Sequence, residues 1–147
     1  MGFQDLSLDE IDHVLEKERI IRVAFSAGGE QFLVPMFYIW HEGALCGLTT
    51  PGRKTRLAEQ NPEVAFQVDS SYVTGPWEWA SVSGQGTFSR VADPAEFGPF
   101  ASRLQHRLSD SPEWAQVMLQ RRFETLGMYP WRITPRELSG RAHGPGD

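Results

Sequence analysis

Closely spaced turns are the feature that most limits how this chain can fold. Glycine-containing turns at 27–30 and 41–43 each follow a short stretch whose residues favour a β-strand. Strands joined by such short turns run antiparallel. Strand patterns occur at residues 20–25, 31–40, 44–49, 64–69, 81–91 and 127–135. Because closing a sheet removes its exposed edges, about six such strands predict a mainly β fold, a small antiparallel barrel with flanking helices.

Helix signals flank these strand patterns. Ser7 and Glu10 form a capping box that starts a first helix, which is expected to end near residue 17. A short helix over about 53–60 follows a Pro-Gly turn. Two further helix starts are predicted, one at Asp93 and one over residues 111–113.

Composition excludes several classes of protein. The formal net charge of -5 argues against nonspecific nucleic-acid binding, which needs a broad basic surface. No apolar run reaches the length of a membrane span, and the N-terminus lacks a signal-peptide pattern. A single cysteine, Cys46, favours a small buried residue in a cytoplasmic protein, and the spacing of the histidines predicts no metal site. One domain is expected over residues 1–147, with a flexible tail over about 141–147.

Positive charge is concentrated at the start of the short helix. Arg53, Lys54 and Arg56 fall in its first turn, where the helix dipole is itself positive. Basic side chains are destabilising there unless an anion binds among them. Free backbone N–H groups and the hydroxyls of Thr49 and Thr50 would suit a phosphate. The alternative is a solvated basic turn, against which stands the rarity of lysine in this acidic chain.

Five segments follow one another in an order and spacing that match a known family. They are residues 22–25, 34–38, 49–54, 61–65 and 79–86. Together they resemble the pyridoxamine 5'-phosphate oxidase-like superfamily, over about residues 7–92 and more weakly at the last strand. The resemblance implies a Greek-key-like, FMN-binding split barrel. It also implies a homodimer that holds each flavin in a cleft between its subunits.

The same resemblance implies contacts to the cofactor. Arg53 and Lys54 would hold the flavin phosphate, and Thr49 and Thr50 would approach the phosphate or the ribityl chain. Backbone groups of four consecutive residues would face the isoalloxazine ring, namely Pro35, Met36, Phe37 and Tyr38. Barrel core is the alternative role for the side chains of these four residues.

Aromatic residues complete the candidate site. Trp79 stands near the position where pyridoxamine phosphate oxidases have a glutamine that contacts the flavin, which is a departure from those enzymes. Trp131 and Arg132 are expected to approach the cofactor of the partner chain, with interface packing as the alternative. Tyr72 and Trp77 could form a stacking wall for a planar ring or a packed interface. A barrel this small cannot enclose a flavin in its own interior, which favours a homodimer with shared sites.

An FMN-dependent oxidoreductase acting on a small molecule is the expected function. The flavin itself would carry the redox chemistry, which agrees with a sequence that shows no nucleophile paired with a base. The departure at Trp79 resembles the nitroimidazole-resistance-type and deazaflavin-dependent relatives more than the vitamin enzyme. The alternatives are a deazaflavin-dependent reductase and a noncatalytic protein that binds flavin or haem.

Overall fold

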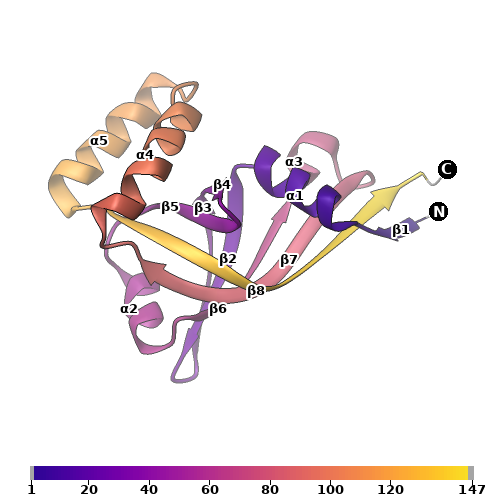
Figure 1. Ribbon diagram of the computed structural model, residues 1–147, viewed down its shortest axis with the longest axis horizontal. Helices are drawn as coiled ribbons and strands as arrows, with labels where there is room; N and C mark the ends of the chain where they lie inside the picture. The colour runs from indigo at the N-terminus through magenta and orange to yellow at the C-terminus, as the bar shows by residue number, and fades with distance from the viewer. Residues whose placement is uncertain (1, 146–147) are drawn as a thin grey trace.

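Residues 2–145 are described by a computed structural model, in which helices flank a strongly curved sheet (Figure 1). The described residues form the strands β1 Gly2–Asp5, β2 Ile20–Ala27, β3 Glu30–Phe37, β4 Ile39–His41, β5 Ala44–Thr49, β6 Glu63–Asp69, β7 Trp79–Arg90 and β8 Tyr129–Gly144. The helices are α1 Leu8–Lys17, α2 Arg53–Gln60, α3 Ser71–Thr74, α4 Pro94–Leu108 and α5 Glu113–Leu126. The prediction of a mainly β chain with flanking helices is confirmed.

A single residue connects the two strands at opposite ends of the sheet. Its strands run in the order β3-β2-β6-β7-β8-β5-β4, with β1 added to β8, and the paired strands are antiparallel. β3 and β4 therefore lie at opposite ends of this path, yet only Tyr38 separates them in sequence. The carbonyl oxygen of Phe37 would lie 2.8 Å from a side-chain carbon added to Gly47 of β5. β3 thus lies close to β5 beside this crossing, and the predicted small antiparallel barrel is confirmed in the form of a split barrel whose edge strands β3 and β4 do not pair.

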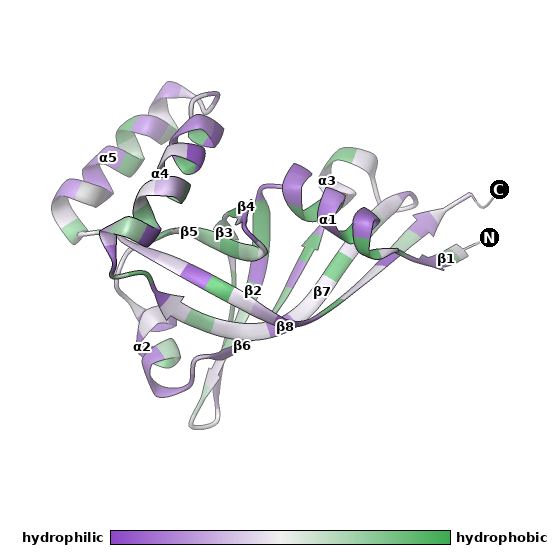
Figure 2. Cartoon of the chain, in the orientation of Figure 1, coloured by the Kyte–Doolittle hydropathy of each residue, from purple (hydrophilic) through white to green (hydrophobic). Residues whose placement is uncertain are grey.

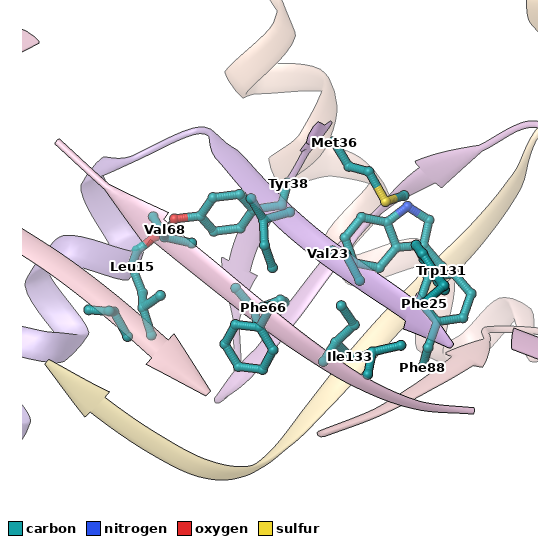
Figure 3. Packing of buried hydrophobic residues seen from close by; sticks show 14 of the residues in the cluster. Leu15, Val23, Phe25, Met36, Tyr38, Phe66, Val68, Phe88, Trp131 and Ile133 are labelled. Carbon is teal, nitrogen blue, oxygen red and sulfur yellow. Dashed lines mark hydrogen bonds between the residues drawn. The ribbon is translucent and has the colours of Figure 1, made fainter. Parts of the chain in front are cut away.

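Side chains from the strands and from α1 fill the barrel (Figure 3). Trp131 of β8 is fully buried and stacks on Phe88, with ring centroids 5.6 Å apart. Its indole fits because a glycine faces it: a Cβ on Gly47 would lie 2.7 Å from the ring. The buried Tyr38 hydroxyl donates a hydrogen bond of 2.8 Å to the carbonyl of Leu15, which ties α1 to the barrel.

The helices begin and pack for local reasons that the sequence contains. At the start of α1, Ser7 and Glu10 each accept a hydrogen bond of 3.2 Å from the other's backbone N–H, which confirms the capping box.

α4 covers a second apolar cluster that includes Phe100 and Cys46. Burial raises the pKa of the Cys46 thiol to about 12, so this residue is a small hydrophobe, as predicted. None of the described helices is long and apolar enough to cross a membrane.

Three predictions of secondary structure are wrong. The strand expected over 31–40 is interrupted at Tyr38, where the chain passes from one edge of the sheet to the other. The last strand, expected over 127–135, extends to Gly144 because the unpredicted β1 pairs with its end, Gly2 opposite Gly144. The flexible tail is therefore wrong for residues 141–144, and residues 146–147 lie outside the described part of the chain.

Candidate functional site

The start of α2 combines basic side chains with backbone groups that no side chain caps. Its N-cap residue is Gly52, which has no side chain that could accept a hydrogen bond from the first N–H groups of the helix. The hydroxyl of Thr55 accepts a hydrogen bond of 2.9 Å from the Gly52 N–H and donates one of 3.0 Å to the Gly52 carbonyl. Ser7 caps α1 and Asp93 caps α4, whereas α3 and α5, like α2, have no side-chain cap. The first turn of α2 differs from that of α5 in its charge, because α5 has Glu113 there and α2 has basic side chains, which favour an anion.

Two of the three cations predicted at this helix start are already paired with a carboxylate. Glu30 accepts from the Arg53 Nε at 2.7 Å and from the Arg56 Nη2 at 3.0 Å. The Arg53 guanidinium also lies 4.5 Å from the centre of the Phe32 ring. These two hydrogen bonds hold the pKa of Glu30 below its usual value. Arg53 is therefore less available to a phosphate than the sequence predicts.

Glu30 reaches α2 because of a tight turn. Gly28 and Gly29 connect β2 to β3 with φ angles of 57° and 82°, a left-handed conformation that glycine adopts without strain. The register of this hairpin places Glu30 opposite Ala27 at its tip. The partner of Arg53 is thus a residue 23 positions away in sequence, and no local pattern reveals it.

Lys54 differs from its two basic neighbours. It is half-buried, and among the described residues no carboxylate lies within ion-pair distance of it. Burial lowers the pKa of its ammonium group, and the nearby positive charge of Arg122 on α5 lowers it further. Thr49, which ends β5, is buried, and its hydroxyl donates to the carbonyl of Thr50 at 3.3 Å. Of the basic pair predicted to hold a phosphate, Lys54 is the member left without a counter-charge.

The four residues expected to face a flavin ring lie on the edge strand β3 and just after it. Within residues 2–145, β3 pairs with β2 on one side only, so its outer backbone groups have no strand partner. Met36 and Tyr38 direct their side chains into the core, whereas Pro35 is exposed and Phe37 half-buried. Backbone contacts with a ring remain a prediction for this edge, and barrel core is the observed role of the Met36 and Tyr38 side chains.

The structure corrects the expectation for Trp131. Its side chain is inside its own barrel, where it cannot reach a cofactor held by another chain (Figure 3). Its indole Nε1 has no hydrogen-bond partner among the described residues. Arg132, the next residue on the strand, points to the opposite face and lies 3.7 Å from Glu96 of α4. Neither side chain is part of the basic helix start.

Trp79 belongs to a second cluster, at the other end of β7. We call it the aromatic shelf and define it as Phe3, Trp79 and His143. The Trp79 and His143 rings stack with centroids 5.6 Å apart, and Phe3 lies 5.2 Å from His143. The guanidinium of Arg141 sits 5.4 Å from the Phe3 ring. Hollows of about 300 and 400 Å³ border Trp79 on its two sides.

His143 is a functional candidate that the sequence prediction missed, because residues 141–147 were expected to be a tail. Its Nδ1 lies 2.6 Å from the carbonyl oxygen of Trp77. A carbonyl only accepts, so Nδ1 carries a proton and donates this hydrogen bond. Arg141 and His143 alternate with Ala142, a spacing that places both on one face of a strand. This alternation is the sequence pattern that could have indicated a strand over these residues.

The helix start of α2 and the aromatic shelf are far apart in one chain. Trp79 is the first and Arg90 the last residue of the 12-residue strand β7, and a strand of this length spans roughly 35 Å. Arg90 and the α2 residue Thr55 line one hollow, so α2 is at the far end of β7 from Trp79.

Among the described residues, no three His, Cys, Asp or Glu side chains are grouped to hold a metal ion.

Comparisons with known proteins find the same fold in several solved structures. Solved structures with the same fold include an FAD-binding protein from Mesorhizobium loti, 24% identical with a TM-score of 0.75, covering 97% of this chain and 99% of that one. An FAD-binding protein from Mycobacterium smegmatis is 18% identical, with a TM-score of 0.65 and coverages of 94% and 98%. An FAD- and haem-binding protein from the same organism is 17% identical, with a TM-score of 0.69 and coverages of 100% and 77%. No curated protein matches the chain.

These likenesses show the split-barrel fold, with its mainly antiparallel half-barrel and flanking helices. The sequence pattern of the pyridoxamine 5'-phosphate oxidase family matches residues 7–142, which is most of the chain. The resemblance inferred from the five sequence segments is therefore confirmed, and the chain belongs to the pyridoxamine 5'-phosphate oxidase family.

Proposed function

We propose that this protein is a flavin-dependent oxidoreductase that acts on a small molecule and binds the flavin phosphate at the start of α2. The observation that carries the proposal is Lys54, a half-buried cation without a carboxylate partner among the described residues, at a helix start that no side chain caps. A phosphate would be stabilised there by the helix dipole and by a charge-assisted hydrogen bond. Membership of the family supports the same reading.

The donors present suit a flavin. Backbone N–H groups at the helix start and the Lys54 ammonium group match a phosphate, and the outer backbone edge of β3 matches the amide-like edge of the ring. When bound, a flavin supplies the transfer of electrons or hydride. The chain's own residues would hold the phosphate, orient the ring along Pro35–Tyr38 and exclude water from one ring face. Thr49 and Thr50, which precede the helix, would line the path between ring and phosphate.

A homodimer is part of the proposal. The aromatic shelf is roughly a strand length from Lys54 in the same chain, so one flavin cannot contact both within a protomer. A twofold dimer would bring the shelf of one chain toward the helix start of the other, and Trp79 would then cover the ring. The exposed Phe3 ring and the half-exposed Trp79 and His143 rings support this arrangement, because aromatic residues are enriched at interfaces.

The identity of the flavin is proposed as FMN, with FAD as the second candidate. The two FAD-binding proteins with the same fold, from Mesorhizobium loti and Mycobacterium smegmatis, favour FAD. FMN and FAD both have a phosphate at the end of the ribityl chain. A deazaflavin coenzyme and haem remain the alternatives to a flavin.

An absorbance spectrum and a titration test the proposal. The purified protein, titrated with FMN, FAD and riboflavin, should quench the fluorescence of the two phosphorylated flavins at concentrations at least tenfold below that needed for riboflavin. Equal affinity for riboflavin would contradict a phosphate site. A haem band in the purified protein, or no binding of any flavin, would contradict the proposed cofactor. Oxidation of a reduced nicotinamide by the flavin-loaded protein then separates an enzyme from a carrier.

A further inference from the structure

The hairpin formed by α4 and α5 contains a helix that does not build the core. The hairpin joins β7 to β8, whose ends pair directly, with Arg90 opposite Trp131, and it stands away from the sheet (Figure 1). α4 is anchored by Phe100 and Leu104, whereas none of the α5 side chains that the structure describes is buried. Hydrophilic and hydrophobic residues are mixed along α5 (Figure 2). Core packing therefore does not account for α5.

One face of α5 carries an apolar patch, which we call the α5 patch and define as Trp114, Val117 and Met118. These residues have the i, i+3, i+4 spacing that places side chains on one side of a helix. Trp114 is 69% exposed, and the patch lines an open hollow of about 560 Å³. Isolated helices of this length are marginal in water, and most helices in proteins are stabilised by packing of their apolar face. A surface that covers the α5 patch would therefore stabilise α5.

α5 is attached to the barrel at the end where α2 begins. The helix ends at Leu126, the chain turns at Gly127 with a φ of 68°, and β8 begins at Tyr129. Tyr129 pairs with Thr49, the last residue of β5, and α2 follows β5 after a short turn. The α5 patch thus belongs to the same end of the barrel as the proposed phosphate site.

A second exposed apolar surface lies at the end of the barrel that carries the aromatic shelf. It consists of Tyr72 and Val73, each 65% exposed, and we call it the α3 patch. α3 is beside the shelf, because Ser70 and Thr74 line one hollow with Trp79. Figure 1 shows α3 and β1 on the opposite side of the molecule from the α4–α5 hairpin. Within one chain the two patches therefore do not cover each other.

The charges around the two patches are opposite in sign. Residues 2–10 and 70–78, which include β1, the start of α1 and α3, contain four carboxylates and no basic side chain, namely Asp5, Asp9, Glu10 and Glu78. Arg141 of β8 is the basic residue beside them, 4.0 Å from Asp5. The hollow at the α5 patch is lined by two arginines and one carboxylate, namely Arg121, Arg122 and Glu113. Surfaces of opposite charge favour contact with each other.

We propose that the α5 patch docks on the α3 patch of a second copy of this chain. The inference rests on the homodimer of the proposed function, in which the aromatic shelf of one chain lies against the α2 end of the other. Because α5 is attached at the α2 end and α3 lies beside the shelf, this arrangement brings the two patches to the same junction. Twofold symmetry repeats the contact, so that α5 of each chain covers α3 of the other.

Each side of this contact has a stated role. Trp114 is the aromatic anchor, the residue type that most often dominates the binding energy of an interface. It packs with Val117 against the partner's Val73. Arg121 and Arg122 lie at the rim, where they face the acidic residues at the shelf end of the partner and help to set the orientation of the two chains.

Trp114→Glu tests the docking, with Gln116→Glu as the matched control. Both variants add one negative charge to α5, but residues 114 and 116 lie about 200° apart around the helix. In sedimentation of the purified protein, the dissociation constant of the Trp114→Glu dimer should be about thirtyfold above that of the wild type, the effect of an interface hot spot. The Gln116→Glu dimer should stay within about twofold. Val73→Glu, on the other patch, should weaken the dimer as Trp114→Glu does.

A charge exchange tests the orientation of the two chains. Arg121→Glu combined with Arg122→Glu should weaken the dimer about tenfold. Adding Glu78→Arg to the same chain should recover part of this loss, because twofold symmetry places each altered surface opposite the other. Glu137→Arg is the control for the third substitution, since this exposed carboxylate of β8 lies outside both patches. It restores the same net charge and should recover nothing.

Several results would overturn the docking. Unchanged dissociation of the Trp114→Glu dimer would show that another surface joins the chains or that α5 has another occupant. Equal recovery by Glu78→Arg and Glu137→Arg would show an effect of net charge alone. If the wild type binds FMN as a dimer that Trp114→Glu does not weaken, the docking fails while the proposed function stands. If Trp114→Glu dissociates the dimer and no flavin binds to the wild type, the proposed function fails while the docking stands. A wild type that is monomeric with FMN bound refutes both the docking and the shared site.

Discussion

The two ends of the barrel carry different binding chemistry. Near α2, Lys54 is a half-buried cation without a carboxylate partner among the described residues, beside a helix start that no side chain caps. At the aromatic shelf, Trp79 stacks on His143, Phe3 packs at a tilt against both rings, and the histidine is fixed by a backbone carbonyl. The first end suits a phosphate and the second a planar ring. A flavin has both groups, and the length of β7 separates the two ends within one chain, which is why we propose a site shared by two chains.

Lys54→Gln removes the unpartnered cation from the first end, and it should have the largest effect. A hydrogen bond to a charged group contributes about 1.5–3 kcal/mol, so FMN should bind about ten- to hundredfold more weakly. Riboflavin should bind equally well to variant and wild type, since it has no phosphate. Fluorescence titration of both ligands measures the effect, and unchanged FMN affinity would refute the assignment of Lys54.

Mixed dimers test whether the two ends belong to one site. When Lys54→Gln and Trp79→Ala chains form a heterodimer, a shared site places both substitutions in one of its two cavities and leaves the other unaltered. The heterodimer should then bind one FMN with wild-type affinity, recovering the ten- to hundredfold lost by Lys54→Gln alone. If each site lies within a single chain, neither cavity recovers, and two weak sites remain. Isothermal titration of the purified heterodimer distinguishes these results.

Trp79→Ala alone should have a smaller effect that does not depend on the phosphate. Loss of a stacked aromatic contact costs about 0.5–1.5 kcal/mol, which is about two- to tenfold in affinity, for FMN and riboflavin alike. Trp77→Ala is the control, because Trp77 is 79% exposed and only its backbone carbonyl contacts His143. An effect confined to FMN would place Trp79 near the phosphate and would contradict the contrast between the two ends.

Glu30→Gln should change FMN affinity least, and in the opposite direction. Without the carboxylate, Arg53 and Arg56 become free cations near the helix start, and FMN should bind about two- to fivefold more tightly. The pKa of Glu30 is lowered by the two arginines, so its carboxylate stabilises the fold above about pH 4.5 and loses this effect as the pH falls through the lowered pKa. Melting temperatures of wild type and variant should therefore differ at pH 7 and converge as the pH falls below the lowered pKa of Glu30.

Features with local causes could be predicted from the sequence. The capping box at Ser7 and Glu10, the bounds of α2 and the turn at Gly28–Gly29 each depend on residues within a few positions of one another. The family could be inferred as well, because its segments keep their order and spacing. The position of the basic cluster at the start of α2 followed from the same local pattern.

Features that depend on distant contacts could not be predicted. Arg53 is paired with the carboxylate of Glu30, which the β2–β3 hairpin brings near it. Trp131 is inside the barrel because Gly47 leaves room for its indole, a fit between residues 84 positions apart. β1 and the end of β8 are strands because they pair with each other across nearly the full length of the chain.

The α4–α5 hairpin also has a consequence for how the chain folds. The backbone N–H of Val91 bonds to the carbonyl of Pro130 at 2.9 Å, so the whole hairpin is a loop closed by neighbouring strand ends. Closing a loop of about forty residues costs about 2 kcal/mol more entropy than closing a four-residue turn. The β2–β3 hairpin, with its two-residue turn, carries no such cost. The pairing of β7 with β8 is thus expected to form later than the β2–β3 hairpin. The barrel is therefore expected to begin folding in its N-terminal half.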